Sequence, residues 1–125
     1  MNALDQARRA YTAPGGPTRT LRGIEYDIFA RVTARLKAAA TSVQPIFSVL
    51  ARALQDNRNL WSVLADDVAD DNNSLPVSLR AQIFSLAAFT DQHTARILAG
   101  KAKPDVLIDI NTAIMRGLRR EGGPE

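Results

Sequence analysis

Few residues of this 125-residue chain could take part in covalent catalysis, and their spacing argues against it. His93 is the single histidine, and it falls at the edge of the apolar face of a predicted helix, where a histidine usually packs. No serine stands in a Gly-x-Ser-x-Gly turn, and the absence of cysteine excludes thiol nucleophiles, disulfides and thiolate metal sites together. We therefore predict that the protein is not an enzyme.

Cation and phosphate sites are not indicated either. The acidic run ADDVADDN at residues 65–72 lacks the Asp-x-Asp-x-Asp-Gly spacing and the final Glu of a calcium loop, and carboxylates on a helix would diverge. We interpret the run as a solvated helix end. The glycines of APGGP at residues 13–17 neither follow a predicted strand nor precede the Lys-Ser or Lys-Thr of a phosphate-binding loop. We expect no cofactor and no bound metal.

Three polar residues each interrupt the apolar stripe of a different predicted helix, namely Glu25, Asn57 and Asn111. A buried polar group costs a few kcal/mol unless it is hydrogen-bonded, so these residues should meet one another, or meet Arg58 or Arg80. For Glu25 we expect burial and an ion pair with one of the two arginines. Two interpretations stay open, a structural polar layer or a polar cluster that contacts a ligand or partner.

Trp61 is predicted to lie in the core because it shares a helical face with Leu64 and Val68, although tryptophan is also frequent in binding hot spots. The candidate site residues, for a polar layer or for partner contact, are Glu25, Asn57, Arg58, Trp61, Arg80 and Asn111.

Helical periodicity predicts an all-α fold, a small antiparallel bundle of about four main helices with a short N-terminal helical segment. The predicted helices span residues 20–40, 45–70, 76–99 and 104–119. The stripe of the second helix runs from Ile46 to Val68, and a break at Asp56 and Asn57 is the alternative to one long helix. We expect one helical domain over residues 20–119, an N-terminal appendage with a Gly- and Pro-rich loop at 1–19, and a disordered tail at 120–125.

The third predicted helix is expected to be the central one. Its main apolar face contains Leu79, Ile83, Leu86, Ala87, Thr90, Ile97 and Leu98. On the opposite side, Ala81, Ala88 and Ala95 repeat every seven residues, and such small side chains let a neighbouring helix approach closely. We therefore expect this helix to be buried on two sides, and Gly100 to end it in a left-handed conformation.

Charge and hydropathy favour a protein without a membrane partner. The net charge is +3, with a basic first third and an acidic middle, which we interpret as a solvated charged face. No apolar run approaches the roughly 20 residues of a membrane-spanning helix, and the first residues lack the apolar stretch of a secretory signal. We expect a cytoplasmic location.

Three motifs, in this order, resemble the flagellar biosynthesis regulator FlaF family of alphaproteobacteria over about residues 11–118. The motifs are Asn57-Arg58-x-Leu60-Trp61, Leu75-Pro76-x-x-Leu79-Arg80-Ala81 and Leu107-Ile108-x-Ile110-Asn111-x-x-Ile114-Met115-x-Gly117-Leu118. The resemblance implies a non-enzymatic regulator of flagellin production and flagellum assembly that opposes the translational regulator FlbT. It also implies chaperone-like binding of flagellin, whose amphipathic terminal helices stay unpaired until the filament assembles.

The alternatives are an RNA-contacting regulator of flagellin mRNA and a purely structural oligomerisation module. The basic first third supports the RNA alternative, but aromatic residues do not interleave with Arg or Lys as single-stranded recognition usually requires, so nucleic acid is not the favoured partner. Flagellin is the favoured partner, and FlbT is a second candidate.

The N-terminal segment carries a testable prediction. Leu4, Ala7 and Tyr11 are spaced for one helical face, so this segment should occupy the flagellin-binding groove when flagellin is absent. Deleting residues 1–17 should then tighten flagellin binding about 5-fold to 150-fold, the range of typical coupling energies. Calorimetric titration of flagellin into the full and shortened chains measures the change. Equal or weaker binding by the shortened chain would show that the segment does not compete.

Overall fold

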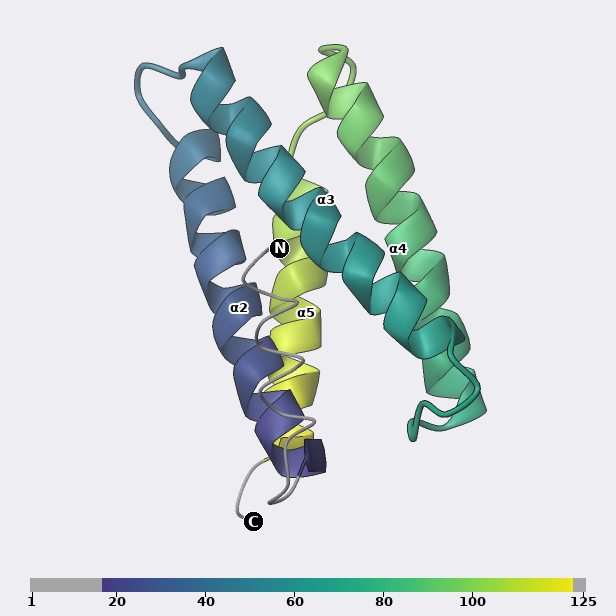
Figure 1. Ribbon diagram of the computed structural model, residues 1–125. Helices are drawn as coiled ribbons and strands as arrows, with labels where there is room; N and C mark the ends of the chain where they lie inside the picture. The colour runs from purple at the N-terminus through teal and green to yellow at the C-terminus, as the bar shows by residue number, and fades with distance from the viewer. Residues whose placement is uncertain (1–16, 123–125) are drawn as a thin grey trace.

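A computed structural model of the chain contains four helices (Figure 1), which are α2 (Pro17–Ala40), α3 (Phe47–Ala69), α4 (Val77–Leu98) and α5 (Asp105–Gly122). The structure describes residues 17–122, with the side chains of residues 26–117. No strand occurs within 17–122, and the predicted all-α fold of four main helices is confirmed. The short helical segment predicted nearer the N-terminus lies outside the described residues.

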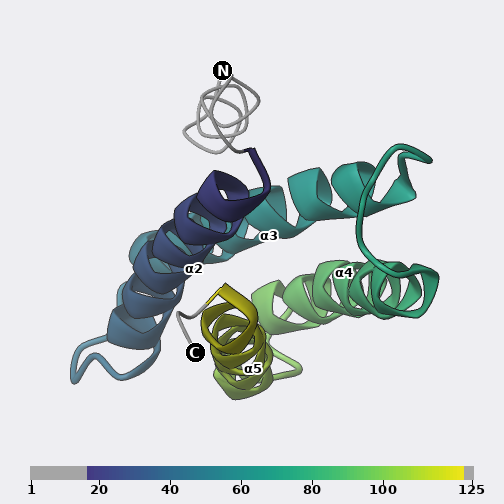
Figure 2. The same ribbon diagram turned by 90° about the horizontal axis from the view of Figure 1, so that it is seen from below.

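The helices form two antiparallel pairs, α2 with α5 and α3 with α4, and the pairs cross each other (Figures 1 and 2). Helix α2 packs against both α5 and α3, whereas α4 packs mainly on α3. The prediction that the third predicted helix, now α4, is central is therefore wrong. The central positions belong to α2 and α3.

Helix α4 is buried on one side only. Ile83, Ala87 and Ile97 lie in the core as predicted. The residues predicted to be buried that are exposed instead are Ala81, Ala88, Ala95 and Leu98. The physical reason is that α5 packs on α2 and not on α4. Within residues 17–122 no further helix is left to cover the second side of α4. Alanine suits a close helix contact, but it is also the best helix former and tolerates water.

Three helix boundaries differ from the prediction by two or more residues. Helix α2 begins at Pro17, inside the predicted loop, and α5 continues to Gly122, inside the predicted tail. Helix α3 begins at Phe47, and Ile46, predicted to point inward, is its N-cap and is 60% exposed. Helix α3 is continuous through Asn57, which excludes the break that the sequence left open.

Gly100 ends α4 as predicted. Its φ of 76° is the left-handed conformation that favours glycine. The backbone N–H of Gly100 donates to the carbonyl of Ile97, and the N–H of Lys101 donates to that of Arg96, each at 2.9 Å. This pair of bonds is a Schellman motif, and it turns the chain towards α5.

The core consists of two apolar clusters. The buried members of the larger cluster are Ile28, Phe29, Val32, Leu60, Trp61, Leu64, Val68, Ile83 and Ala87, and those of the smaller cluster are Leu36, Ala39, Ala53, Leu54, Ile97 and Leu107. In the larger cluster the rings of Phe29 and Trp61 meet edge to face, with centroids 5.7 Å apart. Along α2, α3 and α4, buried polar residues lie between the members of the two clusters, and one of them is the predicted site residue Asn57.

Candidate functional site

The side-chain amide of Asn111 connects three helices inside the core. Its Nδ2 donates to Asn57 Oδ1 at 2.7 Å and to Thr33 Oγ1 at 3.0 Å, and its Oδ1 accepts a hydrogen bond from Trp61 Nε1 at 2.9 Å. An indole N–H can only donate, so the carbonyl oxygen of Asn111 must face Trp61 and the amide nitrogen must face the other two partners. The four side chains therefore hold one another in a single arrangement.

This polar layer extends across all four helices. Its buried members are Thr33 of α2, Asn57 of α3, Thr90 and Thr94 of α4 and Asn111 of α5. The hydroxyl of Thr94 donates to the carbonyl of Thr90 at 2.7 Å. Two buried polar atoms, Asn57 Nδ2 and Thr90 Oγ1, have no hydrogen-bond partner among the described residues. An unsatisfied buried polar group costs about 1 to 3 kcal/mol, so this part of the layer destabilises the fold unless something else binds there.

Three of the six candidate site residues come together in the layer, namely Asn57, Trp61 and Asn111. Each is at most 1% exposed, and of the three only Trp61 lines a groove, the one between α3 and α4. Their arrangement is that of a structural polar layer. The side chain of Glu25 lies outside the described side chains, and the predicted ion pair of Glu25 stays a prediction.

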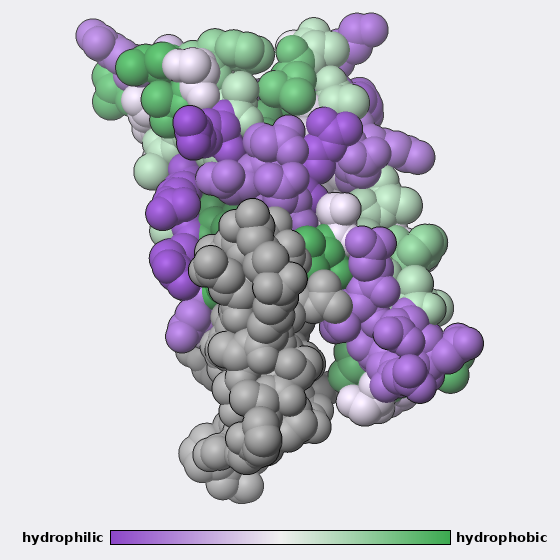
Figure 3. All heavy atoms as spheres, in the orientation of Figure 1, coloured by the Kyte–Doolittle hydropathy of each residue, from purple (hydrophilic) through white to green (hydrophobic). Residues whose placement is uncertain are grey.

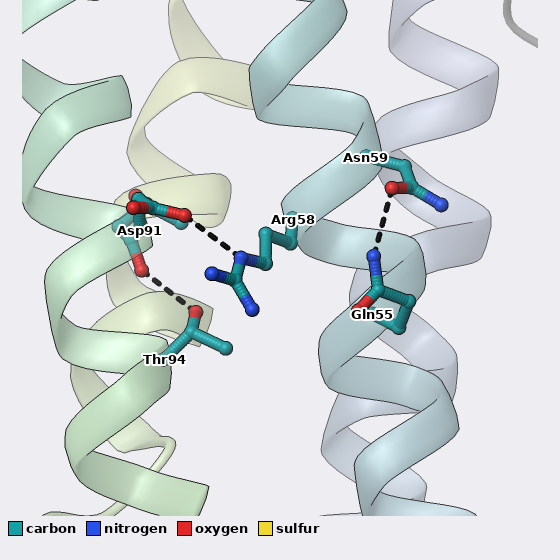
Figure 4. Close-up of polar contacts among 6 residues, drawn as sticks. Gln55, Arg58, Asn59, Asp91 and Thr94 are labelled. Carbon is teal, nitrogen blue, oxygen red and sulfur yellow. Dashed lines mark hydrogen bonds and ion pairs between the residues drawn. The ribbon is translucent and has the colours of Figure 1, made fainter.

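Arg58 lies on the surface, not in the layer. Its Nε donates to Asp91 Oδ1 at 2.7 Å, which links α3 to α4 (Figure 4). Figure 4 also shows Thr94 close by on α4, and Gln55 bonded to Asn59 along α3. Both charged side chains of the ion pair are well exposed, at 38% and 60%, so the pair stabilises the protein by less than about 1 kcal/mol.

Arg80 caps the end of α3. Its Nε donates to the carbonyl of Val68 at 2.8 Å, and its Nη2 donates to the carbonyl of Asp70 at 2.9 Å. The last carbonyls of a helix lack hydrogen-bond partners and carry partial negative charge. An arginine from the next helix supplies hydrogen-bond donors and a positive charge to these carbonyls. Arg80 therefore holds the start of α4 against the end of α3.

The acidic run and His93, which the sequence analysis considered for cation binding and catalysis, make contacts that stabilise the fold. Asp70 and Asn73 make turn contacts after α3, with Asp70 Oδ1 accepting from the N–H of Asn72 and Asn73 Nδ2 donating to the carbonyl of Asp67. His93 is half-buried, stacks on Phe89 with ring centroids 5.2 Å apart, and lies with Nε2 3.0 Å from the carbonyl of Lys103.

The surface feature that sequence reasoning missed runs along α4. We call it the α4 seam, and its exposed residues are Val77, Ala81, Phe84, Ala88, Ala95 and Leu98. Their spacing places them on one face of the helix, and Arg80 and Asp91 interrupt the apolar stripe. The repeat of Ala81, Ala88 and Ala95 marks this face in the sequence, but the sequence analysis predicted that a neighbouring helix covers it. In Figure 3, apolar atoms lie among polar ones on the right-hand side, over α4.

Beside the seam, a groove of about 210 Å³ lies between α3 and α4. Its lining includes Ser62 and Ala65 of α3 and Phe84 and Ala88 of α4. Thr90, whose buried Oγ1 has no hydrogen-bond partner within the described part of the chain, also lines this groove. The groove and the seam together form a largely apolar, helix-sized surface, and the polar residues that line the groove are Arg58, Ser62, Thr90 and Asp91.

In the part of the chain that the structure describes, no helix combines the length and the apolar character needed to cross a membrane. Within the same residues, no three His, Asp or Glu side chains lie together in a way that could hold a metal ion.

Fold and site together define a small all-α bundle with a closed polar core and an open apolar helix face. The chain belongs to the flagellar protein FlaF family, whose sequence model matches residues 7–118. It is therefore a flagellar protein by family. No curated protein and no solved structure matches the chain.

Replacing Asn111 tests the energetic role of the polar layer. Asn111→Ala removes partners from Trp61 Nε1, Asn57 Oδ1 and Thr33 Oγ1, so the free energy of unfolding should fall by about 2 to 4 kcal/mol. Urea denaturation measures the loss. The matched control is Asn59→Ala, which removes an exposed asparagine and should change stability by less than about 0.5 kcal/mol. Similar small effects of both variants would contradict a role for the layer.

Proposed function

We propose that the protein is a cytoplasmic, non-enzymatic regulator of flagellin production and flagellum assembly that binds flagellin in a chaperone-like way. Membership of the FlaF family supports the flagellar role. The single observation that supports protein binding is the α4 seam, an apolar helix face that no other described element covers. The same family relationship makes the translational regulator FlbT a second candidate partner.

The geometry of the seam suits an amphipathic helix as the bound segment. Helix α4 contains 22 residues and is therefore about 33 Å long, enough to contact six turns of a partner helix. The three alanines allow a close approach of the two helix axes, and Phe84, which is 53% exposed, offers a large apolar contact near the middle. The terminal helices of flagellin are amphipathic and have no partner before assembly, so they match this surface.

The driving force is burial of apolar surface. Each Å² of apolar area removed from water contributes about 25 cal/mol, and a contact along the whole seam would bury Val77, Phe84 and Leu98 at once. This burial favours a bound helix over an empty seam.

A charged substitution on the seam tests the proposal. Ala88→Arg places a long cation in the middle of the face and should weaken binding of monomeric flagellin at least about 10-fold, a loss of about 1.4 kcal/mol. Calorimetric titration of flagellin measures the affinity. The matched control is Ala34→Arg, the same change at an exposed alanine of α2, and it should bind like the original protein.

The outcomes separate the alternatives. If the original protein does not bind flagellin, the proposed function is wrong. If both arginine variants bind equally well, flagellin binds elsewhere than the seam. Co-purification of flagellin mRNA without flagellin would favour the RNA-contacting alternative. A dimer in sedimentation that Ala88→Arg converts to a monomer, without flagellin binding, would favour the oligomerisation module.

A further inference from the structure

A larger groove lies where α2 ends and α3 begins, and we call it the corner groove. Its volume is about 750 Å³, and its lining comes from the end of α2, the connection at residues 41–46 and the start of α3. The lining residues used below are Arg35, Ile46, Ser48, Val49, Arg52 and Asp56. None of the residues that line it lines the groove between α3 and α4.

The corner groove has an apolar rim. Ile46 and Val49 line the groove, and Val43 and Phe47 each follow a lining residue directly in the chain. All four are more than half exposed, with Val43 at 96%. Hydrophobic atoms gather at the upper end of the molecule in Figure 3, where α2 ends and α3 begins in Figure 1. Single exposed apolar residues are common, but several that adjoin one another and border a groove mark a binding surface. Stability gives no reason to keep four such side chains in water.

The same groove carries an excess of positive charge. Asp56 Oδ2 lies 3.8 Å from Arg35 Nη1, so this carboxylate is already shared with one arginine. Arg52, also exposed, has no carboxylate partner among the described residues. The groove therefore presents, beside an apolar rim, a guanidinium that no carboxylate of the described residues neutralises.

The start of α3 adds unpaired hydrogen-bond donors. The N-cap, Ile46, makes no side-chain hydrogen bond to the helix, and its carbonyl receives the N–H groups of Val49 and Leu50. The backbone N–H groups of Phe47 and Ser48 have no acceptor among residues 17–122. Free N–H groups at a helix start carry partial positive charge and bind carboxylates well. The N–H groups at the start of α3 and the guanidinium of Arg52 both favour a carboxylate in a ligand.

We propose that the corner groove binds a protein segment that places an acidic side chain next to a large apolar one. The apolar side chain lies against Ile46 and Val49. The carboxylate binds Arg52 and the free N–H groups at the start of α3. An amphipathic helix whose apolar face is bordered by Glu or Asp fits this description. The site is separate from the α4 seam, so it goes beyond the proposed function and does not depend on it.

Two synthetic peptides test the charge requirement. The first is a fluorescein-labelled helical peptide with leucines on one face bordered by glutamates, and the second has lysines in place of the glutamates. Fluorescence anisotropy with the full chain measures binding. The glutamate peptide should bind at least about 10-fold more tightly than the lysine peptide, the difference expected for one lost charge-assisted contact.

Variants of exposed residues place the binding in the groove. Arg52→Glu and Ile46→Ser should each weaken binding of the glutamate peptide at least about 10-fold, and Arg52→Glu should strengthen binding of the lysine peptide. The matched charge control is Arg116→Glu, at an exposed arginine of α5, and the control for the other surface is Ala88→Arg. Both controls should bind the glutamate peptide like the original protein.

Several results would overturn this proposal. They are no binding of the glutamate peptide up to about 1 mM, equal binding of the two peptides, and loss of binding in Ala88→Arg but not in Arg52→Glu. Competition by inorganic phosphate alone, with no effect of Ile46→Ser, would identify a simple anion site instead. Because flagellin binding is tested with a different variant and a different ligand, failure here leaves the proposed function standing, and the reverse also holds.

Discussion

The Asn111 amide is the contact on which the packing of this bundle depends. It reaches α2 through Thr33 and α3 through Asn57 and Trp61, and every one of these side chains is buried. Apolar contacts tolerate sliding of one helix along another, because one leucine replaces the next at little cost. A buried amide does not, because any shift that breaks its hydrogen bonds leaves several polar groups unsatisfied in a medium of low dielectric constant. The polar layer, which lies between the two apolar clusters, therefore sets the register of α2, α3 and α5 along one another.

A closed polar core leaves the surface as the place where partners can bind. The two surfaces that stand out differ in chemistry. The α4 seam is apolar and narrow, with small side chains that admit another helix. The corner groove is wider, and its apolar rim lies beside Arg52 and the uncapped start of α3. The two surfaces share no lining residue, so two different segments could occupy them without competing.

Only part of the polar layer could be predicted from the sequence. Asn57 and Asn111 were recognisable because an amide inside an apolar stripe must be buried if the helix packs by that stripe. Arg58 and Arg80 were assigned to the same layer, but both are long side chains that reach other acceptors, Asp91 and the carbonyls at the end of α3. Thr33, Thr90 and Thr94 were missed as polar members, because a threonine on an apolar face does not disturb the hydropathy pattern.

The sequence by itself determined the four helices, the main buried face of each and the left-handed stop at Gly100, because these depend on propensity and spacing along one segment. The tertiary structure alone decided which faces have a neighbour. The alanine repeat of α4 and the inward prediction for Ile46 were locally sound, yet both sites are open to water, since α5 packs on α2 and α3 begins one residue after Ile46. A helix face is buried only where another element packs on it. The residue pattern of one helix does not tell how many other elements pack around that helix.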